Sequence, residues 1–220
     1  SEIALVAALA GKQVLLTDTS EEALARALGN LDAVLDKGIR RGFYQEADKA
    51  AALGRITTST TLDHHTDRDL VIEAVFESET VKAEVFRTLD RVCRPDVCIA
   101  SNTSTISITT LASYVSPERR SRFIGTHYFS PVSRMKLVEV IPGIDTGDGT
   151  VGLLMDYCRD IGKVPIRVKD VVGFAVNRVL HVFMIEAMRL VEEGVCTPEE
   201  VDVACKLGLG HPVGPFELLD

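Results

Sequence analysis

An alternation of short β-branched segments with helical segments, running through residues 1–170, most constrains how this chain folds. Strands are predicted at 13–17, 55–60, 70–75, 97–100, 123–129, 137–141 and 164–168, with helices between them. Such alternation is typical of an α/β fold with a doubly wound parallel sheet. After Gly173 no strand is predicted, and 174–193 and 198–206 are expected to be helices. We therefore expect a smaller all-α domain over residues 171–220.

Composition excludes several classes of function. Lys and Arg total 24 against 32 Asp and Glu, a net charge of −8, which disfavours a nucleic-acid or anionic-membrane surface. The longest apolar run, 3–10, is far shorter than the roughly 20 residues of a membrane span. Five cysteines without a CxxC motif indicate reduced thiols, in a cytosolic or matrix-like compartment.

The N-terminal helix, turn and strand have the pattern of a dinucleotide-binding unit. Ala4, Ala8 and Gly11 are small enough to let the helix pack closely on the sheet, and Asp18 directly follows the strand. An acid at this position accepts hydrogen bonds from the adenosine ribose. No Arg occurs at 19–21 to meet a 2′-phosphate, so NAD is favoured over NADP. The alternative is that Asp18 is only a turn residue before a helix capped by Ser20.

The glycine loop that normally precedes such a helix is not in the sequence, and we expect the natural product to start earlier. A literal G-x-G-x-x-G occurs at Gly147, Gly149 and Gly152, six residues past a strand. Asp148 would repel a pyrophosphate there. We expect a Gly-rich turn in which Thr146 or Asp148 caps the following helix.

A histidine and a glutamate stand in neighbouring apolar strands. His127 ends the strand at 123–129, and Glu139 lies inside the apolar segment MKLVEVI. Ligands bind at the carboxyl edge of a doubly wound sheet, and a buried carboxylate is costly unless it is paired. A His–Glu pair would satisfy the carboxylate and orient the imidazole for proton transfer. A strand-end histidine alone is more often structural.

The ordered motifs resemble the 3-hydroxyacyl-CoA dehydrogenases over essentially the whole chain. The segments that carry the resemblance are SNTST (101–105), HYFSPV (127–132), MKLVEVI (135–141), VVGFAVNR (171–178) and LGLGHPVGPFELLD (207–220). The resemblance implies a Rossmann-like NAD domain at 1–170 and a helical, homodimer-forming domain at 171–220, with both ends truncated. It also implies reversible NAD-dependent oxidation of (S)-3-hydroxyacyl-CoA to 3-oxoacyl-CoA, in β-oxidation or butyrate-type metabolism. The compartment would be the cytoplasm, or the mitochondrial matrix in a eukaryote.

The resemblance also implies catalytic roles. His127 would be the general base for the 3-hydroxyl, and Glu139 would hold and polarise it. Ser104 would donate a hydrogen bond to the substrate oxygen. Asn177, at the start of the helical domain, would help to position the substrate and His127.

No metal site is expected, because the two histidines at 64–65 lack a further ligand in the sequence.

Cofactor and CoA positions follow in the same way. Glu77, Lys82 and Asn102 match family positions near the nicotinamide ribose, with a solvated helix start or a turn role as the alternative. Three basic residues at i, i+3 and i+4 on the second helix suit the phosphates of CoA, or form a solvated basic face: Lys37, Arg40 and Arg41.

Two sites depart from the family pattern, and two rival functions follow from the scaffold. Ser130 stands where many members have Asn, and Val182 stands where Pro is common. One rival is a non-catalytic CoA- or NAD-binding relative resembling a lens crystallin, which would predict the loss of His127 or Glu139. The other is a β-hydroxy-acid dehydrogenase with a lysine base, against which the His–Glu–Asn set speaks.

Overall fold

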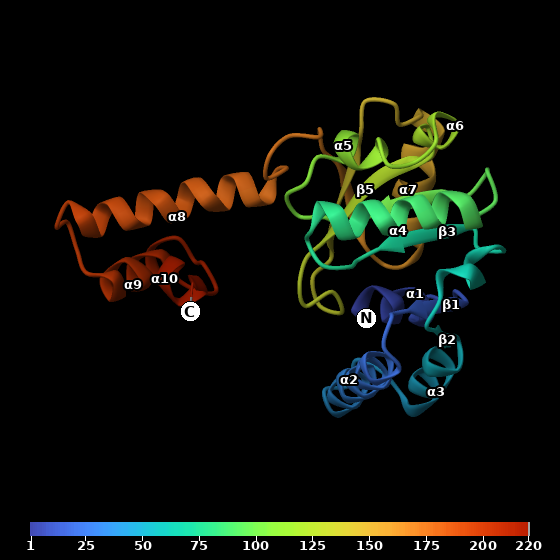
Figure 1. The fold of residues 1–220 in the computed structure, drawn as a ribbon. Coiled ribbons are helices and arrows are strands. Elements are labelled where there is room, and N and C mark those ends of the chain that lie inside the picture. Colours follow the sequence, from blue (N-terminus) through green and yellow to red (C-terminus); the bar gives the residue numbers. More distant parts are fainter. Residues whose placement is uncertain (220) are drawn as a thin grey trace. The chain divides into compact units, whose positions relative to one another are not determined.

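The computed structural model describes residues 1–219, and the chain divides into two compact units between Val171 and Val172 (Figure 1). This division lies one residue beyond the predicted boundary. The strands all belong to the first unit: β1 (Val14–Thr17), β2 (Ile56–Ser59), β3 (Leu70–Glu73), β4 (Cys98–Ser101), β5 (Phe123–Tyr128), β6 (Leu137–Pro142) and β7 (Val164–Arg167). Its helices are α1 (Glu2–Leu9), α2 (Glu21–Arg40), α3 (Glu46–Gly54), η1 (Leu62–His65), α4 (Glu79–Val92), α5 (Ile108–Ala112), α6 (Pro117–Arg120) and α7 (Asp148–Asp160).

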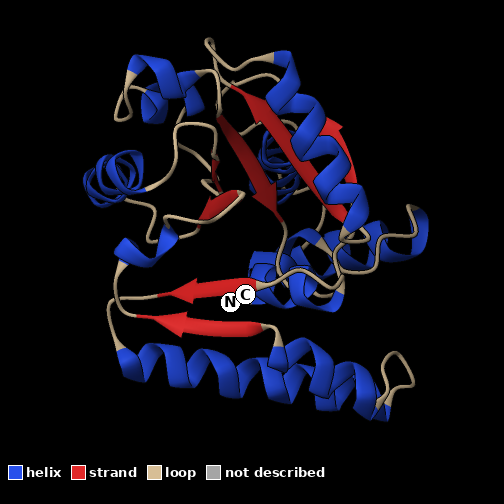
Figure 2. Ribbon diagram, turned by 90° about the vertical axis from the view of Figure 1, so that its right-hand side faces the viewer, coloured by secondary structure: helices blue, strands red, loops and turns tan. Residues whose placement is uncertain are grey.

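The strands form two sheets. β1 and β2 pair in parallel, apart from a five-stranded sheet in the order β3-β4-β5-β6-β7 (Figure 2). Within the larger sheet β3, β4 and β5 are parallel, whereas β6 runs antiparallel to β5. The predicted α/β fold is confirmed. The antiparallel pairing of β5 and β6 differs from the all-parallel sheet that we expected. The connection between these strands, residues 129–136, contains no helix and is too short for a parallel crossover, which needs a dozen or more residues.

Alternating side chains of β5 pack on the two faces of the larger sheet, because successive residues of a strand point to opposite sides. Phe123 contacts Phe86 of α4 edge-on, with ring centroids 4.8 Å apart. Ile124, the next residue, packs on the opposite face of the sheet, in a core cluster with Leu154 and Cys158 of α7. Helices α4 and α7 accordingly cover opposite faces (Figure 1). The carboxyl ends of β3, β4 and β5 lie side by side, because these three strands are parallel neighbours.

Helix α1 packs against both sheets. Val6 and Ala7 belong to the core cluster of the five-stranded sheet, and Leu5 and Ala8 to the cluster formed with α2 and α3. The small side chains permit this double contact. Gly11 then turns the chain into β1 with a φ of 84°, which glycine adopts without strain.

The second unit is a small helical assembly of α8 (Val176–Glu192), α9 (Pro198–Gly208) and α10 (Pro215–Leu219). Ala187, Val201 and Cys205 form its buried core. Asp202, buried on α9, accepts backbone hydrogen bonds from Phe216 and Glu217 at 2.8 and 3.1 Å and so fixes the start of α10. Among the helices of residues 1–219, none is both long and apolar enough to cross a membrane.

Pro117 begins the single turn α6, where its missing N–H costs nothing. One local expectation needs correction. The N-cap of α7 is Gly147, without a side-chain cap, and the Thr146 hydroxyl donates to the Phe123 carbonyl instead. Because β6 is antiparallel, Gly147 follows the strand end that lies beside Ile124, at the start of β5. The G-x-G-x-x-G segment therefore lies at the opposite edge of the sheet from His127.

Candidate active site

His127 and Glu139 lie directly opposite each other on the antiparallel strands β5 and β6. The His127 Nδ1 is 2.8 Å from Glu139 Oε2, the glutamate is fully buried, and the histidine is 5% exposed. Since a carboxylate only accepts, Nδ1 carries the proton of this bond, and the lone pair of a neutral ring lies on Nε2. The ring also packs against Phe129, with centroids 4.6 Å apart. This arrangement holds one imidazole tautomer in one orientation.

The segment after β4 lies beside this pair. The Asn102 side-chain oxygen accepts a hydrogen bond from the Tyr128 backbone N–H at 2.9 Å, which ties the start of 102–105 to the strand end that carries His127. Ser104 and Thr105 donate their backbone N–H groups to Glu77 Oε1 at 2.9 and 3.0 Å. Asn102, Ser104 and His127 are thus brought together at one edge of the sheet.

Glu77 is held by many donors. Besides the Ser104 and Thr105 backbones, it accepts hydrogen bonds from the Thr103 and Thr105 hydroxyls, and Lys82 Nζ lies 3.3 Å from Oε2. Burial alone would raise the pKa of Glu77. The hydrogen bonds and the Lys82 charge outweigh burial and lower the pKa to about 2. The carboxylate is therefore ionised throughout the neutral range.

Lys82 is fully buried, so a solvated helix start does not describe it. Its ammonium lies 2.7 Å from Glu73 Oε1 at the end of β3. Glu73, equally buried, also accepts from the Ser101 hydroxyl at 2.6 Å. Sequence reasoning missed Glu73 and Ser101. The rule that singled out Glu139, a carboxylate in an apolar strand, applies equally to Glu73 in LVIEAV.

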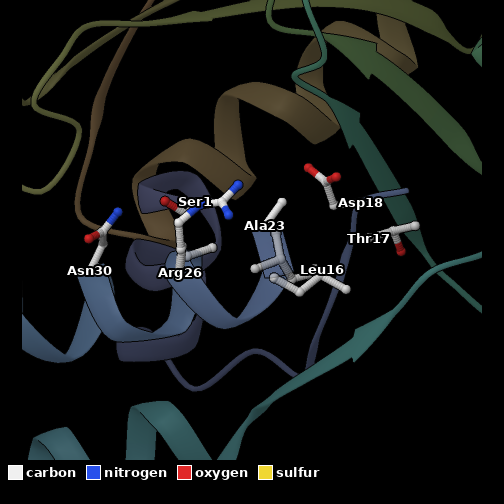
Figure 3. A pocket seen from close by; sticks show the side chains of 9 residues that line it. Ser1, Leu16, Thr17, Asp18, Ala23, Arg26 and Asn30 are labelled. Atoms are coloured by element: carbon white, nitrogen blue, oxygen red, sulfur yellow. The ribbon is translucent and has the colours of Figure 1, made fainter. Parts of the chain in front are cut away.

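Asp18 lies at the opposite end of the candidate cofactor site, where β1 meets α2. Its Oδ1 accepts the Ser20 backbone N–H at 3.2 Å, and the Ser20 hydroxyl in turn caps α2. An open pocket of about 230 Å³ lies beside it, lined by Asp18 and Thr17 together with Arg26 and Asn30 of α2 (Figure 3). An exposed carboxylate at a strand end, beside an open pocket, fits the adenosine ribose of a dinucleotide.

The basic residues Lys37, Arg40 and Arg41 are exposed at the C-terminal end of α2. Asp18 precedes the other end of this 20-residue helix, so the two groups are roughly 30 Å apart at 1.5 Å per residue.

Asn177 is in the first turn of α8, in the second unit. Gly173 and Phe174 precede it with φ of 74° and 47°. Among the described residues, no group of His, Cys, Asp and Glu side chains could hold a metal ion.

A dinucleotide-type α/β unit, a strand-end His–Glu pair and a following helical unit define a class of nicotinamide-dependent dehydrogenases. Residues 1–171 match the NAD-binding domain of 3-hydroxyacyl-CoA dehydrogenase, and residues 173–220 match the C-terminal domain of the same enzyme. The chain belongs to the 3-hydroxyacyl-CoA dehydrogenase family and is an NAD-dependent oxidoreductase.

Individual relatives agree along nearly the whole chain. The mitochondrial hydroxyacyl-coenzyme A dehydrogenase of Sus scrofa is 43% identical over 227 residues, covering 99% of this chain and 71% of that protein. The 3-hydroxybutyryl-CoA dehydrogenase of Clostridioides difficile is 40% identical, covering 96% and 74%. The crystal structure of (S)-3-hydroxybutyryl-CoA dehydrogenase from Ralstonia eutropha superposes with a TM-score of 0.93 at 42% identity, covering 97% and 75%.

Proposed function

We propose that the protein oxidises (S)-3-hydroxyacyl-CoA to 3-oxoacyl-CoA reversibly, with His127 as the general base and Glu139 as the residue that orients it. The buried 2.8 Å contact between these side chains, at the sheet edge where ligands bind, carries the proposal. A non-catalytic relative would have no need to bury a glutamate behind this histidine.

The chain's own residues account for the proton transfer. With its Nδ1–H held by Glu139, His127 presents the Nε2 lone pair to the substrate 3-hydroxyl and takes up that proton. The charge that forms on the ring is stabilised by the Glu139 carboxylate, which is already in place and needs no reorganisation. A bound NAD would supply the acceptor for the hydride that leaves C3. In the reverse direction His127 returns the proton to the oxygen.

Ser104 and Asn177 position the substrate in this proposal. The Ser104 backbone is held by Glu77, so its part-exposed hydroxyl can donate to the substrate oxygen from a fixed place. Asn177, in the first turn of α8, would help to position the substrate. Both donors would bind the oxygen more strongly as it gains negative charge.

For NAD, Asp18 would accept the adenosine ribose hydroxyls, and Glu77 and Asn102 would lie at the nicotinamide end. Because the Lys82 ammonium is buried, Lys82 would act on the cofactor indirectly, through its ion pair with Glu77. The exposed residues Lys37, Arg40 and Arg41 would meet the phosphates of CoA, with a solvated basic face as the alternative.

A homodimer formed through the helical unit is also proposed. Helix α8 leaves large apolar side chains exposed, among them Val179 (72%) and Val182 (65%). Apolar patches of this kind mark protein interfaces. The relatives are bacterial and mitochondrial proteins, and we propose the cytoplasm or the matrix for this one.

The test is NADH oxidation with acetoacetyl-CoA, followed at 340 nm, with free acetoacetate and with NADPH as comparisons. We expect turnover with acetoacetyl-CoA and NADH, little with acetoacetate, and weaker activity with NADPH. If NADH and CoA bind but no turnover occurs, the non-catalytic alternative replaces the proposal.

A further inference from the structure

Glu73 is a buried carboxylate that the proposed chemistry does not use. Its two oxygens accept three hydrogen bonds. Lys82 Nζ and the Val75 backbone N–H reach Oε1 at 2.7 and 2.6 Å, and the Ser101 hydroxyl reaches Oε2 at 2.6 Å. The side chains of Glu73 and Lys82 are both 0% exposed.

These partners belong to the two segments that carry the candidate nicotinamide-binding residues. Val75 starts the segment that leads to Glu77, and Ser101 starts the segment that leads to Asn102 and Ser104. The Asn102 N–H also donates to the Glu73 carbonyl, at 2.8 Å. Glu73 therefore contacts both segments at their roots, through its side chain and its backbone.

An ion-pair chain through Lys82 links Glu73 to Glu77. The Lys82 ammonium bridges Glu73 Oε1 and Glu77 Oε2, at 2.7 and 3.3 Å. A buried cation is costly unless it is paired, so the position of Lys82 depends on Glu73. Because Lys82 and the backbones of Ser104 and Thr105 all hold Glu77, a shift of Lys82 is transmitted to the segment 102–105.

We propose that Glu73 is a positioning residue for the nicotinamide end of the cofactor, holding the segments 74–78 and 101–105 in one arrangement through Lys82 and Ser101. The inference rests on the proposed function, because that function places the nicotinamide against Glu77, Asn102 and Ser104. Glu73 itself is fully buried and acts through these residues.

The variant Glu73→Gln changes this network with little change of shape. Three donors point at the carboxylate, but a glutamine has one acceptor oxygen and one NH₂ donor. Whichever way the amide turns, its NH₂ faces another donor, and Lys82 keeps only Glu77 as a charged partner. We therefore expect about a tenfold rise in the Kd for NADH, which corresponds to about 1.4 kcal/mol.

The experiment compares NADH with ADP as fluorescence or calorimetric ligands. ADP occupies only the adenosine end, near Asp18. We expect Glu73→Gln to weaken NADH binding about tenfold while ADP binding stays within about twofold. The milder variant Ser101→Ala removes the hydroxyl that donates to Glu73 and accepts from the Thr103 N–H, but leaves the Lys82 pair intact. It should give a smaller weakening of the same kind. It provides the test if Glu73→Gln does not fold.

Asp90→Asn is the matched control. Asp90 lies on the same helix α4 and holds Arg119, with its Oδ1 3.0 Å from Nε, away from the cofactor segments. We expect a lower Tm with unchanged NADH binding.

Unchanged NADH binding in both Glu73→Gln and Ser101→Ala would overturn the inference, as would a parallel loss of NADH and ADP binding. A wild-type protein that binds NADH without turnover would contradict the proposed function alone.

Discussion

Single residues decide the chemistry at the end of β5, where Glu139 determines what His127 can do. The carboxylate lies 2.8 Å from Nδ1, and in the proposed mechanism it lies where positive charge would form during proton transfer. This role depends on its charge and on its placement opposite His127 in the strand register.

Glu139→Gln should therefore reduce kcat by roughly 10²-fold, because a neutral amide still accepts the Nδ1–H bond but stabilises the imidazolium poorly. KM should change little. The measurement is steady-state acetoacetyl-CoA reduction, with Glu118→Gln, an exposed residue of α6, as the control. A kcat equal to that of the wild type would remove Glu139 from the proposed mechanism.

Glu77 makes an acid-dependent contribution to stability. Its pKa in the folded protein is about 2, below the ordinary 4.5, so the unfolded chain takes up this proton first as the pH falls. The stabilisation is complete above pH 4.5 and is lost as the pH falls through 2. Glu77→Gln should flatten the stability curve between these values in urea titrations, whereas the exposed Glu84→Gln should keep the wild-type slope. Parallel curves for wild type and Glu77→Gln would contradict the account.

At the scale of elements, strand β5 leaves little room for a larger side chain near the His127–Glu139 pair. A Cβ on Gly125 would come within 2.6 Å of Ile108 Cδ1, so this glycine permits the close approach of α5 to β5. The Asp170 carboxylate holds α5 in place by accepting the Ile108 and Thr109 N–H groups at 3.0 and 2.8 Å.

Gly125→Ala should destabilise the fold by about 1–3 kcal/mol through overpacking. Gly152→Ala is the matched substitution in α7, where the added Cβ meets nothing within 4 Å beyond the adjoining residues and backbone of its own helix. It should stabilise by about 0.5–1 kcal/mol, because alanine is the better helix former. Urea unfolding measures both. Equal effects of the two substitutions would show that the close contact at Gly125 is unimportant.

Particular elements show how far sequence reasoning reaches. Periodicity located the strands and long helices of the first unit because their apolar faces are buried, and the strand-end rule brought attention to His127. The antiparallel β6 was not predicted, since pairing direction depends on the crossover and not on the strand's own residues. Glu73 was within reach of the rule that singled out Glu139, a carboxylate in an apolar strand. Ser101 was missed because its hydroxyl meets Glu73 only where β3 and β4 pair in the folded sheet.

At the scale of the whole molecule, the two units divide the proposed tasks. The first holds the candidate base and cofactor residues, and the second contributes Asn177 and an exposed apolar helix.

Val182→Glu tests the dimer. A charge at the centre of an apolar interface is costly to bury, so we expect Val182→Glu to be monomeric in light scattering after gel filtration. The wild type and the control Glu192→Gln, which changes an exposed residue of the same helix, should both be dimeric. A dimer in Val182→Glu would place the interface elsewhere.

The most direct test of the central claim is the turnover of His127→Gln with acetoacetyl-CoA and NADH, with NADH and CoA binding measured in the same samples. The account predicts a fall in kcat of roughly 10²–10⁴-fold, the usual contribution of a general acid or base, with both affinities within about twofold of the wild type. Turnover at the wild-type rate would contradict the assignment of His127 as the proton-transfer residue.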